Sequence, residues 1–316
     1  MMETLRHAFY RSALLLFAVT SIVACASAAV QKSENAAFRI ELPSEPVVEG
    51  SVFYVTLVSR RALQDIVGNF QGHLISFYPD ISGVAIDSRE LATEHQAGEY
   101  RYKALVGVSY GAPSGDTSFV VKARQADETF EIKNGVQVQS GVFPAETLRV
   151  PPRTIMPNAR DKRQIARDRA FLKRAYASKL KTKFWDPPAV LPVESAVTSV
   201  YGTSRVYNGK KQNVHLGTDL RARTGTPLLI PLTGKVVVAR RLFYTGFTVV
   251  IDHGYGLFTI YGHLSRLKVK EGQLVKKGKV MGLAGATGRA SGPHLHWGVH
   301  LHGAKIDPLT LVKALR

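Results

Sequence analysis

The sequence predicts a mainly β protein in which two β domains are joined by a basic helix. Three observations predict this fold class: short runs rich in β-branched and aromatic residues over 38–148, a basic helical pattern within 149–188, and further strand-like runs with tight turns over 189–316. The length of 316 residues suggests two domains and leaves room for a core in each. Apolar residues at 45% and charged residues at 21% are ordinary for a globular chain.

Residues 1–28 have the composition of an export signal peptide. Two arginines precede an apolar run over 13–24, which is too short to span a bilayer and has the length of a signal-peptide core. Two kinds of processing stay open: residues 22–25 resemble a lipoprotein box that would place a lipid on Cys25, and residues 26–28 fit ordinary small-residue cleavage. We therefore expect an exported protein of the periplasm or of the outer-membrane-anchored envelope, either as a lipoprotein or in soluble form.

The first domain, over 38–148, is predicted to be an immunoglobulin-like β-sandwich. Strand-like runs alternate with turn signals at regular spacing, and the pair Asn134-Gly135 between two such runs predicts a hairpin turn. The sequence of this stretch contains no catalytic constellation. Its two isolated histidines, His73 and His95, are expected to face solvent or to be satisfied within the fold.

The linker, over 149–188, is predicted to contain one basic helix from Asn158 to about Lys183. Asn158 has the side chain of an N-cap, Ile165 and Phe171 contribute to a narrow apolar stripe, and paired prolines mark the end of the linker. The basic face of this helix either touches anionic lipid or wall polymer or is simply solvated. The sequence leaves both roles open.

The formal charge of +18 is distributed unevenly. Residues 38–148 carry 9 basic and 14 acidic side chains, residues 149–188 carry 12 and 3, and residues 189–316 carry 18 and 5. The linker and the second domain therefore favour polyanionic surroundings such as acidic wall polymers, lipopolysaccharide or nucleic acid, and no specific nucleic-acid partner is predicted. The acidic first domain could dock on the basic second domain and restrict its groove. We treat this as a hypothesis.

Five side chains of the second domain have the residue types and spacing of a mononuclear metal site. They are His215 and Asp219 in an H-x3-D pair, the single His263, and His294 and His296 in an H-x-H pair. Zinc binds imidazole nitrogen and carboxylate oxygen, and a catalytic zinc site uses three protein ligands and keeps one open position. Alternate residues of a strand share a face, so His294 and His296 are expected to point the same way. Because Cys25 is the only cysteine, thiolate ligands are excluded.

The same histidines lie within a dense series of motifs. These are Tyr201-Gly202, His215-x-Gly-x-Asp219, Gly225-Thr-Pro227, Ile251-Asp-His-Gly-x-Gly256, Tyr261-Gly-His-Leu264, Val275-Lys-Lys-Gly-Lys-Val-Met-Gly282 and Thr287-Gly-x-x-x-Gly-Pro-His-Leu-His296. Through them the stretch from about Thr198 to Leu311 resembles the lysostaphin-type (LytM-domain) zinc metallopeptidases, which cleave peptide bonds in peptidoglycan. The resemblance implies an antiparallel-β peptidase domain. The chain departs from the family pattern at Val214, Gly262 and Ala290-Ser291, where proline, alanine and Ser-Thr are common.

The resemblance implies one Zn²⁺ per chain, held by His215, Asp219 and His296. It also implies that His263 and His294 are the catalytic histidines, which assist a metal-activated water in its attack on the amide carbonyl. No glutamate stands next to a ligand as in H-E-x-x-H peptidases, so these histidines are left to transfer protons. Which of the two is the general base stays open. None of the departures removes a ligand or a catalytic histidine, so an active enzyme is expected.

The predicted function is an exported zinc metalloendopeptidase that hydrolyses peptide cross-links of bacterial peptidoglycan, with the peptide stems as substrate. One alternative is a non-catalytic wall-binding protein or an activator of other wall hydrolases, and another is a zinc peptidase with a different target, such as glycine-rich proteins. Among cross-links, D-alanyl–diaminopimelyl bonds are favoured and glycine bridges are the runner-up. The oligomeric state and the role of residues 38–148, inhibitory or recruiting, stay open.

Other polar residues of the second domain are expected to have structural roles. His253 lies in a predicted turn, and His300 and His302 continue the H-x-H face but are expected to pass beyond the pocket. Tyr261 and Ser291 either contact substrate or serve packing and turn formation.

Overall fold

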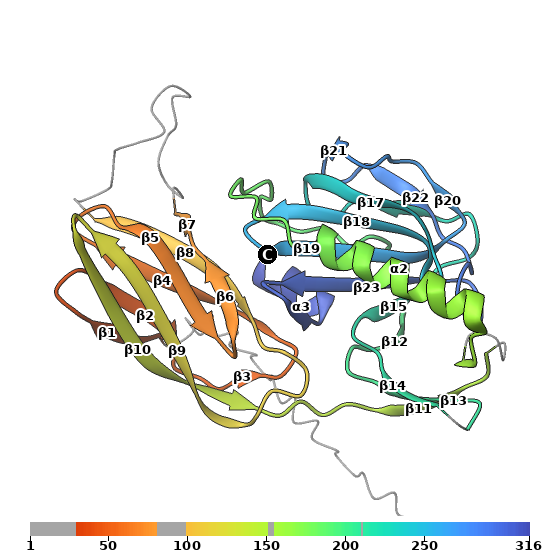
Figure 1. Ribbon diagram of the computed structural model, residues 1–316, viewed down its shortest axis with the longest axis horizontal. Helices are drawn as coiled ribbons and strands as arrows, with labels where there is room; N and C mark the ends of the chain where they lie inside the picture. Colours follow the sequence, from red (N-terminus) through yellow and green to blue (C-terminus); the bar gives the residue numbers. More distant parts are fainter. Residues whose placement is uncertain (1–29, 81–98, 151–154, 210) are drawn as a thin grey trace, which may run out of the picture.

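The computed structural model describes residues 30–80, 99–150, 155–209 and 211–316, and it confirms a mainly β chain (Figure 1). The predicted signal peptide with Cys25, and likewise His95, fall outside the described residues. The helices within those ranges are α2 and α3. Neither of them has the length and apolar character that crossing a membrane requires.

The N-terminal part of the chain is a sandwich of two five-stranded sheets. One sheet is antiparallel in the order β1-β2-β4-β8-β7, and the other has the order β3-β10-β9-β5-β6, in which only the short β3 runs parallel to its neighbour. The strands are β1 (Val30–Glu34), β2 (Arg39–Pro43), β3 (Val47–Val48), β4 (Val52–Ser59), β5 (Gln64–Phe70), β6 (His73–Ser76), β7 (Tyr78–Pro79), β8 (Tyr100–Gly107), β9 (Gly115–Gln125) and β10 (Glu128–Gln139).

An aromatic core lies between the two sheets. Phe53, Phe70 and Phe119 are buried there, and the rings of Phe53 and Phe70 meet edge to face with centroids 5.5 Å apart. Each fully buried side chain of this kind stabilises the fold by about 1.5–3 kcal/mol relative to an exposed one. His73, which was expected to face solvent or to be satisfied within the fold, is partly buried, and its Nε2 lies 3.2 Å from Ser109 Oγ.

The predicted hairpin turn at Asn134-Gly135 is wrong, because both residues lie inside β10. They pair with Phe119 and Ser118 of β9, and the chain reverses instead near Ala126, whose φ of 51° lies in the left-handed region. The glycine serves a close approach: a Cβ on Gly135 would lie 2.1 Å from Asp116 Oδ1. A side chain on the neighbouring strand, which the local sequence does not reveal, therefore explains this Asn-Gly pair.

The stretch of chain after β10 contributes one strand and one helix to the second domain. Strand β11 (Ala145–Leu148) lies at the end of the range predicted to be the sandwich, and it pairs in parallel with β13 (Ser204–Tyr207) of the second domain. Helix α2 (Ala159–Ala175) begins at Asn158, whose side chain accepts a hydrogen bond of 2.9 Å from the backbone N–H of Asp161. The helix ends before Lys183 and lies across one face of the large sheet (Figure 1).

The second domain is built on an eight-stranded antiparallel sheet in the order β12-β15-β23-β19-β18-β17-β21, with β24 added beside β23. A three-stranded sheet, β16-β22-β20, packs beside it, and β11, β13 and β14 form another. The elements are β12 (Val197–Ser199), β14 (Lys211–Val214), β15 (Thr218–Arg221), β16 (Pro227–Leu229), β17 (Gly234–Leu242), β18 (Gly246–Gly254), β19 (Leu257–Leu264), β20 (Arg266–Leu267), β21 (Leu274–Val275), β22 (Val280–Leu283), β23 (His294–Leu301), β24 (Ala304–Ile306) and α3 (Pro308–Ala314).

The two faces of the large sheet have different partners. One face packs Val238, Val250 and Phe258 against α2, whose last turn brings Tyr176 to within 5.4 Å of the Phe258 ring. The other face is part of a separate core, in which Trp297 is fully buried. Because β23 alternates between these faces, its histidines lie on the α2 side and its apolar residues lie in the core.

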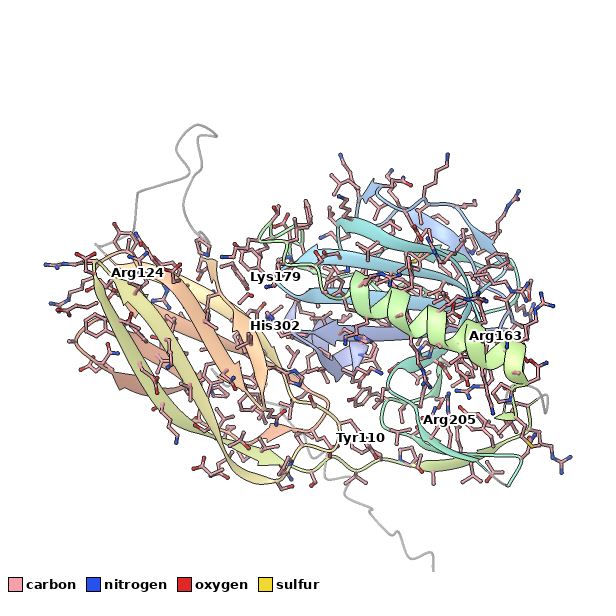
Figure 2. All side chains as sticks on the ribbon, in the orientation of Figure 1. Tyr110, Arg124, Arg163, Lys179, Arg205 and His302 are labelled. Atoms are coloured by element: carbon pink, nitrogen blue, oxygen red, sulfur yellow. The ribbon has the colours of Figure 1, made fainter. Side chains whose placement is uncertain are left out.

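The sandwich docks on the second domain through an apolar junction near β24 and α3 (Figure 1). Leu105 packs into one cluster with Trp185 and Ile306, and the backbone N–H of Asp307 donates to the Gly50 carbonyl at 2.8 Å. Figure 2 places His302 between the two domains. The contact is thus formed mainly by apolar packing, whereas the charge distribution suggested docking of acidic on basic surface.

Candidate metal centre

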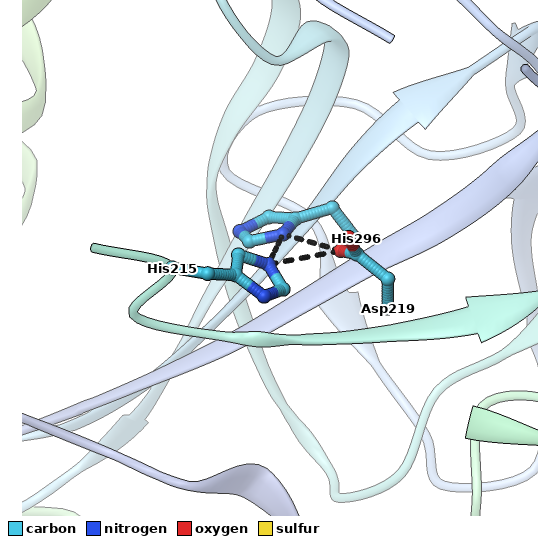
Figure 3. A group of neighbouring side chains, drawn as sticks. All are labelled: His215, Asp219 and His296. Carbon is cyan, nitrogen blue, oxygen red and sulfur yellow. Dashed lines mark hydrogen bonds and ion pairs between the residues drawn. The ribbon is translucent and has the colours of Figure 1, made fainter. Parts of the chain in front are cut away.

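The three predicted ligands converge on one point (Figure 3). Asp219 on β15 and His296 on β23 are direct cross-strand partners, and His215 reaches them from the segment between β14 and β15. The Nε2 atom of His215 lies 3.0 Å from Nδ1 of His296, and Oδ1 of Asp219 lies 3.0 Å and 2.9 Å from these two atoms. Strand pairing and one short connection therefore build the group.

This donor set fits zinc. A tetrahedral zinc ion with ligand bonds of about 2.0–2.1 Å separates neighbouring ligand atoms by about 3.3 Å, so the three donors already form one face of such a tetrahedron to within a few tenths of an ångström. Two imidazole nitrogens and one carboxylate oxygen are also the ligand types that zinc takes in catalytic sites. The glycine at position 217 allows this packing, because a Cβ there would lie 2.5 Å from the His296 ring.

The first predicted ligand, His215, is held neutral and oriented. Its side chain is buried, and burial lowers its pKa from 6.5 to about 4, so its ring is uncharged at neutral pH. The Nδ1 atom lies 3.3 Å from the Val200 carbonyl oxygen, which can only accept a hydrogen bond. The proton therefore sits on Nδ1, and the lone pair on Nε2 points toward the other two ligands.

The second predicted ligand, Asp219, is held ionised. Burial alone would raise its pKa, but its close contacts with the His215 and His296 rings bring the pKa well below its usual value. Its other oxygen, Oδ2, accepts a hydrogen bond of 2.6 Å from Nη2 of Arg205. One carboxylate oxygen thus faces the histidines while the second is fixed by a guanidinium.

Arg205 connects Asp219 to strand β11. Its side chain is only 12% exposed, its Nε donates to Glu146 on β11, and its Nη2 also donates to Ser199 Oγ at 2.8 Å (Figure 2). Sequence reasoning did not identify Arg205 or Glu146. Glu146 is distant in sequence from every ligand and lies in a range predicted to be sandwich, so only the β11–β13 pairing reveals its place.

The two predicted catalytic histidines flank the ligand group. The ring centroids of His263 and His294 are 4.7 Å apart, and His294 Nε2 lies 3.8 Å from Asp219 Oδ2. The Nδ1 of His263 donates to the Thr287 carbonyl at 2.7 Å, and that of His294 donates to the Gly292 carbonyl at 2.9 Å. Both rings are therefore fixed in the tautomer that leaves Nε2 free to accept a proton.

His263 is also held by its backbone and by its surroundings. Its φ of 64° lies in the left-handed region, which costs an L-residue about 1–2 kcal/mol and persists where the surroundings fix it. Its N–H donates to the Thr245 carbonyl at 2.6 Å. Burial, followed by the charges of His296 and His294, lowers its pKa to about 3, so the ring is neutral at physiological pH.

These side chains open onto one cavity of about 240 Å³. Asp219, His263 and His294 form one part of its lining, Glu146 and Arg205 form another, and the segment 289–293 closes a third side. Ser291, for which substrate contact and turn formation were both considered, belongs to that third side. A peptide segment entering the cavity would meet Asp219, His263 and His294 together.

The remaining singled-out residues lie away from the ligand group. His253 is fully buried, with its ring nitrogens 2.8 Å from the Thr233 carbonyl and from Thr259 Oγ1, as expected for a structural histidine. His300 stacks on Tyr176 of the linker at 4.1 Å, and His302 packs at the domain junction. Tyr261 is fully buried, so it serves packing. Its hydroxyl donates to Thr259.

Comparisons with known proteins agree with this arrangement. Residues 213–308 match the family model described as Peptidase family M23. A structure from Pseudomonas aeruginosa, assigned to peptidase M23 by a structural genomics consortium, is 26% identical with a TM-score of 0.60 and is matched over 86% of this chain and 96% of its own. The likeness in fold thus extends beyond the residues that the family model matches.

Two curated relatives match 37% of this chain. Peptidoglycan DD-endopeptidase ShyB of Vibrio cholerae serotype O1 is 40% identical over 122 residues, which cover 37% of this chain and 29% of the relative. ShyA of the same organism, also named a peptidoglycan DD-endopeptidase, is 39% identical over 121 residues, which cover 37% and 28%. The chain therefore spans less than a third of the length of these relatives.

The antiparallel sheet and the His/Asp/His group define a lysostaphin-type domain, as the sequence motifs predicted. With the family match over 213–308, this part of the chain is assigned as a Peptidase family M23 domain.

Proposed function

We propose that the protein is an exported zinc-dependent endopeptidase that hydrolyses peptide cross-links of bacterial peptidoglycan. The observation that carries this proposal is the convergence of His215, Asp219 and His296 on one point, with Asp219, His263 and His294 lining one cavity of about 240 Å³. A domain that kept the fold only for binding would not need two further histidines with free Nε2 atoms at the ligand group.

The roles of the side chains follow from their contacts. When bound, zinc supplies Lewis acidity that acidifies water and polarises a peptide carbonyl. His263 and His294 present Nε2 lone pairs to the cavity, so they are placed to take a proton from the attacking water and return one to the leaving amine. Arg205 holds the carboxylate of Asp219 in the orientation that metal binding needs.

The bond that we propose is the D-alanyl–diaminopimelyl cross-link. The names of ShyB and ShyA as peptidoglycan DD-endopeptidases support it. A protein of Neisseria meningitidis serogroup B that is 37% identical over 98 residues, covering 31% of this chain and 23% of the relative, is named DD-carboxypeptidase/endopeptidase Mpg. Glycine bridges stay the runner-up among cross-links.

We also propose that the protein acts in the periplasm or on the outer-membrane-anchored envelope, as a lipoprotein or in soluble form, with its basic linker near anionic polymer or membrane surface. A cavity of about 710 Å³ between α2 and the sheet supports a polyanionic contact, because Arg160, Arg167 and Arg241 line it. Asp161 is the one acidic residue in its lining.

The test is incubation of the signal-free protein with purified cross-linked muropeptides, with the products identified by mass spectrometry. His296→Ala should abolish turnover because it removes a ligand. His73→Ala is the matched control, since His73 lies in the sandwich and should leave turnover unchanged.

The products discriminate among the functions. Conversion of dimers to monomers by the intact protein alone supports the endopeptidase, and the new termini identify the bond. No turnover of any muropeptide with zinc present would favour the non-catalytic wall-binding or activator function. Cleavage of glycine-rich protein without cleavage of muropeptides would favour the peptidase with another target.

A further inference from the structure

An arginine with no ion pair lies in the lining of the cavity. Arg289 is in the segment 289–293 that faces Asp219, His263 and His294 across the same space. The other charged groups of the lining are paired, because Arg205 bonds both Glu146 and Asp219. Among the residues that the structure describes, Arg289 has no carboxylate within ion-pair distance, so the lining presents one free positive charge.

The guanidinium of Arg289 is held between two aromatic rings. It lies 4.7 Å from the centroid of the Tyr207 ring and 4.5 Å from that of Tyr244. Aromatic rings stacked on a guanidinium restrict its rotamers but leave the N–H groups at its edge free to bind. Less conformational entropy is then lost when a planar anion binds. This is the arrangement that carboxylate recognition requires.

The backbone connects Arg289 to the catalytic histidine. The backbone N–H of Arg289 donates to the Tyr244 carbonyl at 2.7 Å. Two residues earlier, the Thr287 carbonyl accepts a hydrogen bond of 2.7 Å from Nδ1 of His263. Gly288 between them has a φ of 79°, and a Cβ there would lie 2.4 Å from the Gly246 nitrogen. The position of Arg289 is therefore fixed relative to the group that transfers the proton.

We propose that Arg289 binds the carboxylate that stands on the carbon next to the scissile nitrogen, on the leaving-amine side of the substrate. In a D-alanyl–diaminopimelyl cross-link the amine that leaves carries such a carboxylate, whereas a glycine bridge has none at an internal bond. Arg289 is thus a specificity-determining residue that selects an acidic leaving group. This inference rests on the proposed function and identifies its substrate class.

The test compares two synthetic cross-linked dimers that differ only at this carboxylate, free in one and amidated in the other. The zinc-loaded full chain should prefer the free acid by roughly 10- to 100-fold in kcat/KM, the range of one charge-assisted bidentate contact. Arg289→Ala should bring this ratio close to one by lowering kcat/KM for the free acid alone. Arg289→Lys should retain part of the preference, because it keeps the charge and loses the planar fork.

Two controls separate specificity from damage. Arg223→Ala removes an exposed arginine of the same domain and should leave the ratio unchanged. Zinc content and Tm should be the same in all variants. Equal losses for both dimers in Arg289→Ala, or a wild type that does not distinguish the dimers, would overturn the proposal.

The outcome is separable from that of the proposed function. If no protein hydrolyses either dimer, the endopeptidase proposal fails, and the Kd values of the two dimers for the zinc-loaded chain decide the role of Arg289. Tighter binding of the free acid that Arg289→Ala removes would still support carboxylate recognition. Equal Kd values would reject it.

Discussion

Arg205 fixes the orientation of the carboxylate of Asp219, a predicted metal ligand. Its guanidinium takes one carboxylate oxygen at 2.6 Å and leaves the other for His215 and His296. Its Nε donates to Glu146, and the Nη2 that bonds Asp219 also donates to Ser199 Oγ. A hydrogen bond to a charged group contributes about 1.5–3 kcal/mol, which is enough to fix the carboxylate before any ion binds.

Arg205→Ala should weaken zinc binding by roughly 10- to 100-fold, the effect typical of removing the partner that orients a ligand. The Kd is measured by competition with a chromogenic chelator. Glu146→Gln should weaken binding less, because Arg205 keeps its bond to Asp219. Arg223→Ala serves as the control, and a Kd in Arg205→Ala equal to that control would reject the orienting role.

His253 gives stability a pH dependence of known sign. Burial lowers its pKa from 6.5 to about 4, so between these values the unfolded chain binds a proton that the folded chain does not. The free energy of unfolding therefore falls as the pH falls through this window, by up to about 1.4 kcal/mol per pH unit. Denaturant titrations in the presence of a chelator give the free energy of unfolding at each pH. Its slope against pH should be smaller by that amount in His253→Gln than in the wild type. Parallel curves from pH 6.5 to 4 would contradict this expectation.

At the scale of elements, β23 supplies both chemistry and core. His294 and His296 lie on the face toward the cavity, while Leu295 and Trp297 are fully buried on the other face. This division could be predicted, because strand side chains alternate. The hairpin at Asn134-Gly135 was predicted wrongly. The glycine lies within a strand, where it leaves space for the side chain of Asp116 on the neighbouring strand.

Mutations on the two faces of β23 should have different effects, one on stability and the other on turnover. Leu295→Ala should lower the free energy of unfolding by about 2–5 kcal/mol, the usual effect of truncating a buried leucine, and should leave one zinc per chain at low temperature. His294→Ala should abolish turnover with little change in Tm. Calorimetry and muropeptide hydrolysis are the measurements. A destabilisation by His294→Ala as large as that by Leu295→Ala would show that the faces are not independent.

At the scale of the whole molecule, the sandwich and the second domain share an apolar contact. Gly107 of β8 stands against β24, where a Cβ would lie 2.7 Å from Cγ2 of Ile306. The hydroxyl of Tyr201 donates to the Lys305 carbonyl at 2.7 Å beside the same strand. The charge asymmetry suggested the hypothesis of docking by opposite charge, and it could not reveal this contact because apolar complementarity depends on the folded surfaces.

Gly107→Val should separate the two domains, because no room exists for the added side chain at the junction. Calorimetry should then resolve two unfolding transitions, and small-angle scattering should show a larger radius of gyration. Thr129→Val, on an exposed strand position of the sandwich, is the matched control. One cooperative transition and an unchanged radius in Gly107→Val would contradict a rigid junction at this glycine.

The sequence predicted which candidate residues lie together, but it did not predict the residues that hold them in place. His215, Asp219 and His296 do converge, and they were singled out because their spacing matches strand alternation and a known family pattern. Arg205, Glu146 and Arg289 could not be identified in this way, because their roles depend on the pairing of β11 with β13 and on the aromatic rings around the cavity. Such tertiary contacts have no periodic signal in one sequence.

The most direct test of the central claim is a titration of zinc into metal-free protein while the hydrolysis of cross-linked muropeptide is followed. The rate should rise in proportion to zinc and saturate at one ion per chain. The variants His215→Ala, Asp219→Asn and His296→Ala should neither bind this ion tightly nor turn over substrate. Full hydrolysis without metal, or saturation at one zinc with no hydrolysis, would contradict the claim.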